Sequence, residues 1–284
     1  MSTSKNRILI LTPTLGRSEY LQQSIDAVAA LSLDIIHILV CPGDKLVELR
    51  QRFPKCRVAV DAGKAGGIYG ALNAGLAAAD ASEIEWDWFT YINDDDLLTP
   101  GFEKMVKMHC RGDNLGSVAY GDIQNIDGKD KPLGRQTVET NPRFFAPLLQ
   151  QGISPAAQQG MLFGAPVVRA LQGFRLQFKL CADLDFWARA HALGFPFSYY
   201  SLEVGQFRIQ AGQLSGDTSV TRKELDTIIG ELFKKQSSGA LKFFARTRYR
   251  IFNIPRYIER YRRLGRATSS YDMLSGGGKK QPVT

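Results

Sequence analysis

The chain has 284 residues, of which 44% are hydrophobic and 23% charged, and its formal net charge is +8. This balance is typical of a globular protein with a sizeable core, and the absence of a run of about 20 apolar residues excludes a membrane-spanning helix. The polar start and the short first apolar run exclude a signal peptide, and four scattered cysteines without a C-x-x-C pair exclude a zinc site or disulfide frame, so we expect a cytoplasmic protein.

Alternating strands and helices are expected over the first hundred residues. Residues 7–12 form an apolar run that ends in a turn at Pro13, a pattern typical of a buried parallel strand. Ser18 is a candidate N-cap for a helix over residues 19–31. Further strands are expected at residues 35–40, 57–60 and 88–93, with helices at 44–53 and 68–79. This order predicts an α/β fold with a mostly parallel sheet and helices on both faces.

The second half has a more mixed pattern. We expect a strand at residues 118–122 followed by a hairpin turn at Asp127-Gly128, a helix at 183–193 and a strand at 197–200. After residue 222 the pattern becomes helical, basic and aromatic. The glycine-rich end, residues 275–284, is expected to be disordered.

Positive charge is concentrated in this C-terminal segment. Between Lys234 and Arg266 there are eleven Lys or Arg residues and one acid, Glu259, and many aromatic residues lie among them. Three interpretations fit: a helix lying on an anionic membrane surface, a helix packed on the rest of the protein, or a nucleic-acid-binding segment. We favour the membrane surface and expect no nucleic-acid partner, because only this segment is basic. Pro255 should kink or split the helix.

Active sites in parallel α/β sheets lie beyond the carboxyl ends of the strands. Here those ends are followed by residues 12–17, 41–45, 61–67 and 93–96. The last of them contains three consecutive carboxylates, Asp94, Asp95 and Asp96, which repel one another unless a cation lies among them. Oxygen ligands suit Mg²⁺ or Mn²⁺. The alternative interpretation is a solvated acidic turn before the next helix.

A resemblance to a known family adds to this interpretation. The segment Gly67-Ile68-Tyr69-Gly70-Ala71-Leu72-Asn73-Ala74-Gly75, followed by Asn93-Asp94-Asp95-Asp96, resembles family 2 glycosyltransferases with the GT-A fold, especially bacterial members that build surface polysaccharides. Other segments agree in order over residues 7–216: Thr12-Pro13-Thr14, Tyr120-Gly121-Asp122, Gly173-Phe174, Ala182-Asp183-Leu184-Asp185-Phe186-Trp187-Ala188-Arg189, and Phe207-Arg208 before Gly212 and Ser215.

The resemblance implies roles for individual residues. Asp95, supported by Asp94 or Asp96, would hold the metal ion against a nucleotide diphosphate donor. Asp183 would be the base that takes the proton from the acceptor hydroxyl in an inverting transfer, although it could merely cap a helix. The candidate donor-binding residues are Thr12, Pro13, Thr14, Arg17, Lys64, Gly67, Asn73, Asp94 and Arg208. Asp185 is expected to be structural and to pair with Arg189 at i,i+4.

The expected organisation follows from the extent of the resemblance. Residues 1–222 would form the GT-A catalytic domain, with a nucleotide-sugar half at about 1–116 and an acceptor half at 117–222. A basic helical extension would follow at 223–274. The acceptor would be a saccharide or a lipid-linked saccharide. Two alternatives remain: a degenerate sugar-nucleotide or nucleic-acid binding protein, and a nucleotidyltransferase. Cys41-Pro42-Gly43-Asp44 departs from the family pattern, so the nucleotide stays open.

Overall fold

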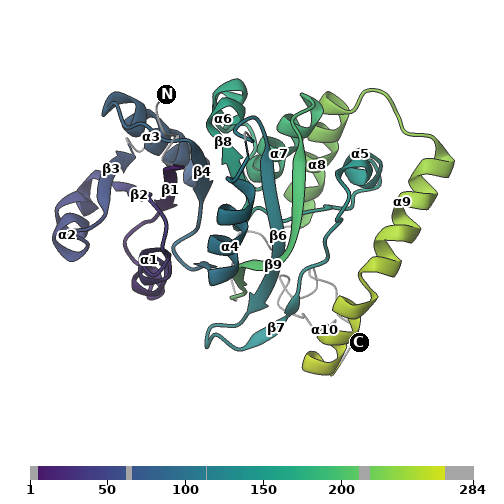
Figure 1. Ribbon diagram of the computed structural model, residues 1–284, viewed down its shortest axis with the longest axis horizontal. Helices are drawn as coiled ribbons and strands as arrows, with labels where there is room; N and C mark the ends of the chain where they lie inside the picture. Colours follow the sequence, from purple (N-terminus) through teal and green to yellow (C-terminus); the bar gives the residue numbers. More distant parts are fainter. Residues whose placement is uncertain (1–5, 62–65, 113, 211–217, 266–284) are drawn as a thin grey trace, which may run out of the picture. The chain divides into compact units, whose positions relative to one another are not determined.

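A computed structural model describes residues 6–61, 66–112, 114–210 and 218–265 (Figure 1). The contacts divide the chain into two compact units. The first contains residues 1–123 and 157–206, and the second contains residues 124–156 and 207–284. Residues 124–156 group with the C-terminal helices. The domain boundary expected near residue 222 stays a prediction. The tail expected at 275–284 lies outside the described residues.

The strands of the first unit form a mixed sheet. They are β1 (Ile8–Pro13), β2 (Ile35–Pro42), β3 (Arg57–Asp61), β4 (Trp88–Tyr91), β5 (Leu97–Leu98), β6 (Val118–Ile126), β8 (Leu162–Gly164) and β9 (Phe197–Arg208), of which β6 and β9 continue into the second unit. The strand order is β3-β2-β1-β4-β8-β6-β9-β5. Strands β1 to β4 pair in parallel, whereas β8 pairs antiparallel with β4 and β6, and β5 antiparallel with β9. The predicted α/β fold with a mostly parallel sheet is confirmed, with added antiparallel strands.

Helices cover both faces of the parallel strands, as predicted. The helices of the first unit are α1 (Leu21–Ala29), η1 (Gly43–Lys45), α2 (Leu46–Arg52), α3 (Gly67–Ala81), α4 (Pro100–His109), α6 (Ala165–Leu171) and α7 (Ala182–Ala192). Leu39 and Cys41 of β2 share a core with α1 and α2. Val40 points to the other face, where α3 packs so closely that a Cβ on Gly75 would lie 2.8 Å from the Val40 side chain. Figure 1 shows α3 across the strands from α1 and α2.

One predicted helix start is wrong. Helix α1 begins at Leu21, its N-cap position is Tyr20, and no side chain caps it. The Ser18 hydroxyl instead accepts a hydrogen bond from the Tyr20 N–H at 3.2 Å and donates one to the Asp94 carbonyl at 3.1 Å. Ser18 therefore connects the turn after β1 with the turn after β4 at residues 93–96, called the acidic turn below.

The second unit is built on a hairpin and the C-terminal helices. Its elements are β7 (Pro132–Arg135), η2 (Pro142–Phe144), α5 (Phe145–Leu149), α8 (Thr218–Leu232), α9 (Gly239–Phe252) and α10 (Ile254–Leu264). β7 pairs antiparallel with the end of β6 across the expected Asp127-Gly128 turn. Leu148 of α5 packs on Ala245 and Tyr249 of α9. In the described part of the chain, no helix is both long enough and apolar enough to cross a membrane.

The expected break at Pro255 is confirmed. Helix α9 ends at Phe252 and α10 begins at Ile254, with the buried Asn253 between them. The Asn253 side chain exchanges two hydrogen bonds of 3.0 Å with the backbone of Val138. This amide contact fixes the junction of the two helices within the second unit.

Candidate active site

The three carboxylates after β4 have separate environments. Asp94 accepts a hydrogen bond from the Thr14 hydroxyl at 2.5 Å, on the turn after β1. Asp96 is fully buried and accepts from the side-chain amides of Asn93 at 3.2 Å and Gln159 at 3.4 Å. Asp95, between them, is partly exposed. Within the described residues, no three His, Cys, Asp or Glu side chains converge as a metal cage. The sequence placed the three acids together but could not show that their side chains diverge.

This donor set fits an ion that is shared with a substrate. Mg²⁺ keeps several waters and is often bound through one or two carboxylates and the substrate's phosphates. A partly exposed Asp95 beside Asp94 meets that requirement. Burial and the neighbouring charge of Asp95 raise the pKa of Asp94, and the hydrogen bond from Thr14 opposes this. A cation near the turn would favour the ionised forms of both Asp94 and Asp95.

The end of β1 and the turn after it carry four of the candidate donor-binding residues. Thr12 is buried, and its hydroxyl lies 2.9 Å from Nε2 of His37. Burial lowers the pKa of His37 to about 4, so this histidine is neutral near pH 7. Pro13 ends β1, Thr14 reaches Asp94, and Arg17 is exposed. The turn after β1 therefore contacts the acidic turn, as expected for segments that follow the carboxyl ends of neighbouring parallel strands.

The start of α3 explains the glycine-rich motif. Gly67, the first residue of the helix, has a φ of +53°, which favours glycine. Asn73 exchanges two hydrogen bonds of 2.8 Å with the backbone N–H and carbonyl of Phe174. Tyr69, one turn earlier, donates to the Leu180 carbonyl at 3.1 Å and to Asp183 Oδ1 at 3.3 Å. The motif thus holds the segment that leads into α7, and the contact of Asn73 with the donor stays a prediction.

Asp183 lies in the first turn of α7 and is partly exposed. The N-cap position belongs to Cys181, whose side chain makes no capping bond. Asp183 Oδ1 accepts hydrogen bonds from the Tyr69 hydroxyl and from the Leu184 N–H at 2.7 Å. Because Asp183 lies two residues beyond the N-cap position, the alternative interpretation as the N-cap of α7 does not fit.

The predicted pair of Asp185 with Arg189 is confirmed. Asp185 is fully buried, and its carboxylate accepts from Nε of Arg189 at 2.9 Å and from Nε of Arg175 at 3.0 Å. Arg189 also donates to the carbonyls of Leu171 at 2.6 Å and Gly173 at 2.7 Å. This network fixes the loop before α7 and the first turns of the helix, so Asp185 has a structural role next to Asp183.

The hydroxyl of Tyr91 lies near both Asp183 and the acidic turn. Tyr91, the last residue of β4, is fully enclosed, and burial raises the pKa of its hydroxyl well above the usual value. The charges of Asp183 and Asp96 raise that pKa further. Both carboxylates therefore act on one hydroxyl at the carboxyl end of β4. Neither Tyr69 nor Tyr91 was among the predicted site residues; the spacing of Tyr69 and Asn73 by one helical turn was the available signal.

Two candidate residues remain, Arg208 and Lys64. Arg208 belongs to the second unit, where its buried guanidinium donates to the Asp127 carbonyl at 3.0 Å and to Asp130 at 2.6 Å. It holds the turn between β6 and β7 there. Lys64 lies outside the described residues. Their contacts with a diphosphate stay predictions.

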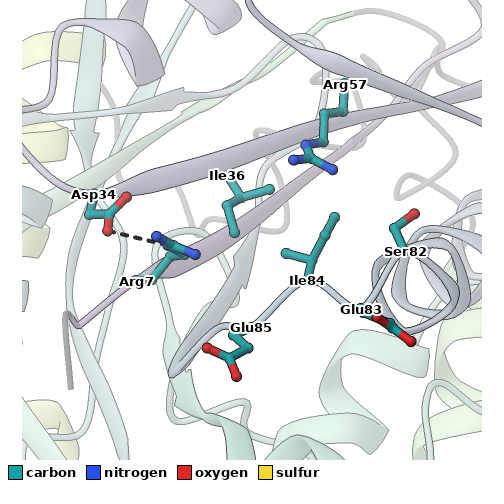
Figure 2. A pocket seen from close by; sticks show the side chains of 8 residues that line it. All are labelled: Arg7, Asp34, Ile36, Arg57, Ser82, Glu83, Ile84 and Glu85. Atoms are coloured by element: carbon teal, nitrogen blue, oxygen red, sulfur yellow. Dashed lines mark hydrogen bonds and ion pairs between the residues drawn. The ribbon is translucent and has the colours of Figure 1, made fainter. Parts of the chain in front are cut away.

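A surface pocket of about 470 Å³ lies at the amino ends of the parallel strands, opposite the ends that carry the acidic turn (Figure 2). Its residues come from the starts of β1, β2 and β3 and from the segment between α3 and β4: Arg7, Asp34, Ile36, Arg57, Ser82, Glu83, Ile84 and Glu85. Arg7 is paired with Asp34 at 3.2 Å. Because parallel α/β sheets bind ligands at the carboxyl ends of strands, this pocket is not the expected donor site.

Comparisons with known proteins concern the family of the sequence and the fold of the structure. The sequence profile of glycosyl transferase family 2 matches residues 9–165. No curated protein matches the sequence significantly. S. aureus TarS has a similar structure, with a TM-score of 0.57 and 13% identity, and the match covers 87% of this chain and 43% of the TarS chain. The chain thus spans less than half the length of that TarS chain.

Two other solved structures share the fold. The mannosyltransferase PcManGT from Pyrobaculum calidifontis, solved with GDP-Man and Mn²⁺, has a TM-score of 0.51 and 10% identity, covering 97% of this chain and 76% of its own. Glucosyl-3-phosphoglycerate synthase from Mycobacterium tuberculosis, solved with Mn²⁺, UDP and phosphoglyceric acid, has a TM-score of 0.53 and 16% identity, covering 82% of this chain and 80% of its own.

Proposed function

The chain belongs to glycosyl transferase family 2, and we propose that it is an inverting, metal-dependent glycosyltransferase. It moves a sugar from a nucleotide diphosphate donor to a hydroxyl of a saccharide or lipid-linked acceptor in surface polysaccharide synthesis. One observation carries the proposal: Asp183 is hydrogen-bonded to Tyr69 of the motif helix α3, and both Asp183 and Asp96 of the acidic turn lie close enough to the Tyr91 hydroxyl to raise its pKa.

The reaction divides between two sets of carboxylates. Asp183 accepts the proton of the acceptor hydroxyl while that oxygen attacks the anomeric carbon of the donor. The bond from this carbon to the diphosphate breaks on the opposite face, so the anomeric configuration inverts. Asp95, with Asp94 or Asp96, would hold Mg²⁺ or Mn²⁺, which when bound supplies positive charge to the leaving diphosphate.

Hydrogen bonds within the first unit keep these groups in place. Thr14 orients Asp94, and the amides of Asn93 and Gln159 hold Asp96. Such support matters because catalytic groups must be fixed to within about half an ångström. The turn after β1, the start of α3 and the acidic turn together would bind the donor.

Nucleotide-dependent stabilisation tests this function without knowledge of the acceptor. In the presence of Mn²⁺, one nucleoside diphosphate or its sugar conjugate should raise the melting temperature by roughly 5 °C at about 100 times its Kd, because it binds only the folded state. The same panel with a chelator is the control, together with Mn²⁺ alone. If no nucleotide shifts the melting temperature but lipid or nucleic acid does, the protein is a binding protein and not a transferase.

We also propose that α9 and α10 bind a membrane surface. In α10, Ile254, Tyr257, Ile258 and Tyr261 follow helical spacing and are all exposed, whereas Arg260 is 1% exposed. A helix of a soluble protein normally buries its apolar side, so this polarity is reversed. Phe243 and Phe244 of α9 are also exposed, by 64% and 56%.

The packing of the second unit explains the reversal. Arg260 lies against Gly134 of β7, where a Cβ would meet its side chain at 2.5 Å. Arg135 pairs with Glu259 of α10 at 2.8 Å. The close packing of Arg260 on Gly134 and the ion pair of Glu259 with Arg135 place these charged residues of α10 against β7, and the apolar side of the helix is left exposed.

Charge favours an anionic membrane as the partner of this apolar side. The exposed cations of α9 and α10 are Arg246, Arg250, Arg262 and Arg263. Glu259 is the single acid of these two helices, and it pairs with Arg135 and Arg263. Aromatic residues between cations are typical of helices that lie in the headgroup region of anionic lipid. A lipid-linked acceptor would lie at the same surface.

Sedimentation with lipid vesicles tests the membrane proposal. Changing Phe243 and Phe244 together to Ser should weaken binding to vesicles with anionic lipid by about tenfold or more, because both rings leave the lipid. Added salt should weaken binding of the unchanged chain. The matched control changes Val47 and Leu193, which are exposed by 64% and 61% in the first unit. Equal loss in both double variants, or no binding of the unchanged chain, contradicts the proposal.

A further inference from the structure

The Tyr69 side chain is held in one position by several contacts. Its ring stacks on Phe174 with centroids 5.9 Å apart, and Phe174 stacks on Phe186 at 4.2 Å. Tyr91 meets the edge of the same Phe174 ring at 5.6 Å. Because Asn73 fixes the Phe174 backbone with two hydrogen bonds, the Tyr69 hydroxyl cannot shift without disturbing this aromatic stack.

The hydroxyl of Tyr69 acts as a donor to Asp183. Burial and the charge of Asp183 raise the pKa of Tyr69 well above its usual value, so the phenol keeps its proton. Its single proton has two acceptors within reach, the Leu180 carbonyl at 3.1 Å and the Asp183 carboxylate at 3.3 Å. The side chain is 6% exposed, so water competes little for these bonds.

We propose that Tyr69 is a positioning residue that orients the Asp183 carboxylate and holds it ionised, and thereby sets the lower pH limit of transfer. A hydrogen bond donated to a carboxylate favours its charged form. The proposed base therefore stays ready to accept a proton at lower pH than it would without the phenol. The catalytic part of this inference rests on the proposed function, whereas the link between the two side chains does not.

Other titratable groups lie near Asp183. Arg175 and Arg189, from the loop before α7 and from α7 itself, both bind Asp185. On β4, the pKa of the Tyr91 hydroxyl is raised by burial and also by the charges of Asp183 and Asp96. Cys181, at the start of α7, lies near enough to act on Tyr69. Tyr69→Phe leaves the contacts of Arg175 and Arg189 in place and removes two hydrogen bonds, the one to the Leu180 carbonyl and the one to Asp183. Of these two bonds, only the second involves a carboxylate, so the titration of Asp183 reports on it.

Titration of the carboxyl groups tests the link directly. The protein is labelled with ¹³C at the aspartate carboxyl groups, and the Asp183 signal is assigned by its loss in Asp183→Asn. The midpoint of this signal should move to higher pH in Tyr69→Phe. The matched control is Tyr249→Phe, because Tyr249 is also buried and its hydroxyl also faces a carbonyl, that of Ser154 at 3.5 Å. An Asp183 midpoint that stays the same in folded Tyr69→Phe overturns the proposal.

The pH profile of nucleoside diphosphate release gives the catalytic readout. In Tyr69→Phe the acid limb of kcat should move to higher pH, and kcat below that limb should fall about tenfold. Adding Tyr69→Phe to Asp183→Asn should cost nothing further, since Tyr69 acts through Asp183. If the midpoint moves but Asp183→Asn retains full activity, the base assignment fails and the Tyr69 link stands. If the acid limb stays in place while Asp183→Asn is inactive, Tyr69 does not set the pH limit.

Discussion

Replacing Asp183 by Asn should lower the rate of sugar transfer by about 10²–10⁴-fold and leave donor affinity nearly unchanged. Asparagine has the same shape and keeps an oxygen that can accept the Tyr69 hydrogen bond, which spans 3.3 Å in the native protein. It cannot take a proton from an acceptor hydroxyl. The change therefore removes the chemistry and preserves the contacts between α3 and the start of α7.

The measurement compares the rate of nucleoside diphosphate release with the donor affinity in the same protein. Asp80→Asn is the matched control, because Asp80 is an exposed acid near the other end of α3. If Asp183 served only to interact with the dipole of α7, its replacement would cost at most about 1 kcal/mol of stability and leave the rate intact. An active Asp183→Asn protein would falsify its assignment as the base.

The sequence was most informative about elements with strong periodicity. Strands β1 to β4 and helix α3 lie where the apolar patterns predicted them, because a buried parallel strand has a continuous apolar run and a helix repeats its apolar face at each turn. The predicted Ser18 cap was wrong for a specific reason: its hydroxyl accepts from the Tyr20 N–H, but residues 19–20 form a turn and the helix begins only at Leu21. The hydroxyl also donates to the carbonyl of Asp94, 76 residues away, and local preference could not reveal that contact.

The candidate site depends on contacts that local patterns do not contain. Asn73 meets Phe174 across 101 residues of sequence, and Gln159 meets Asp96 across 63. The motif therefore indicated that Asn73 mattered, whereas the fold showed what it holds. The same limit applies to α10: its amphipathic pattern was readable, but contacts with β7 decide that Arg260 is buried and Tyr261 exposed.

Replacing Asp95 by Ala should abolish the metal-dependent part of donor binding. The loss of one of the few protein ligands of a Mg²⁺ or Mn²⁺ ion should weaken donor affinity in Mn²⁺ by about 100-fold or more, since loss of an outer-shell partner alone typically costs 10–100-fold. Stability should change little, because Asp95 is partly exposed. Calorimetry with the stabilising nucleotide, with Mn²⁺ or with chelator, measures the effect.

The neighbouring acids separate this role from a purely structural one. Asp96→Ala should lower the melting temperature even without metal, because the side-chain amides of Asn93 and Gln159 lose their buried acceptor. Asp95→Ala should show the opposite combination: a normal melting temperature, and in Mn²⁺ the weak donor affinity that the unchanged protein has with chelator.

If Asp95→Ala binds the donor equally well and still responds to Mn²⁺, then the turn after β4 is held by Thr14, Ser18 and Gln159 for its shape alone. The metal would then have to be bound elsewhere. Two different losses in adjacent residues would instead show that the turn uses Asp96 as its anchor and Asp95 as its metal ligand.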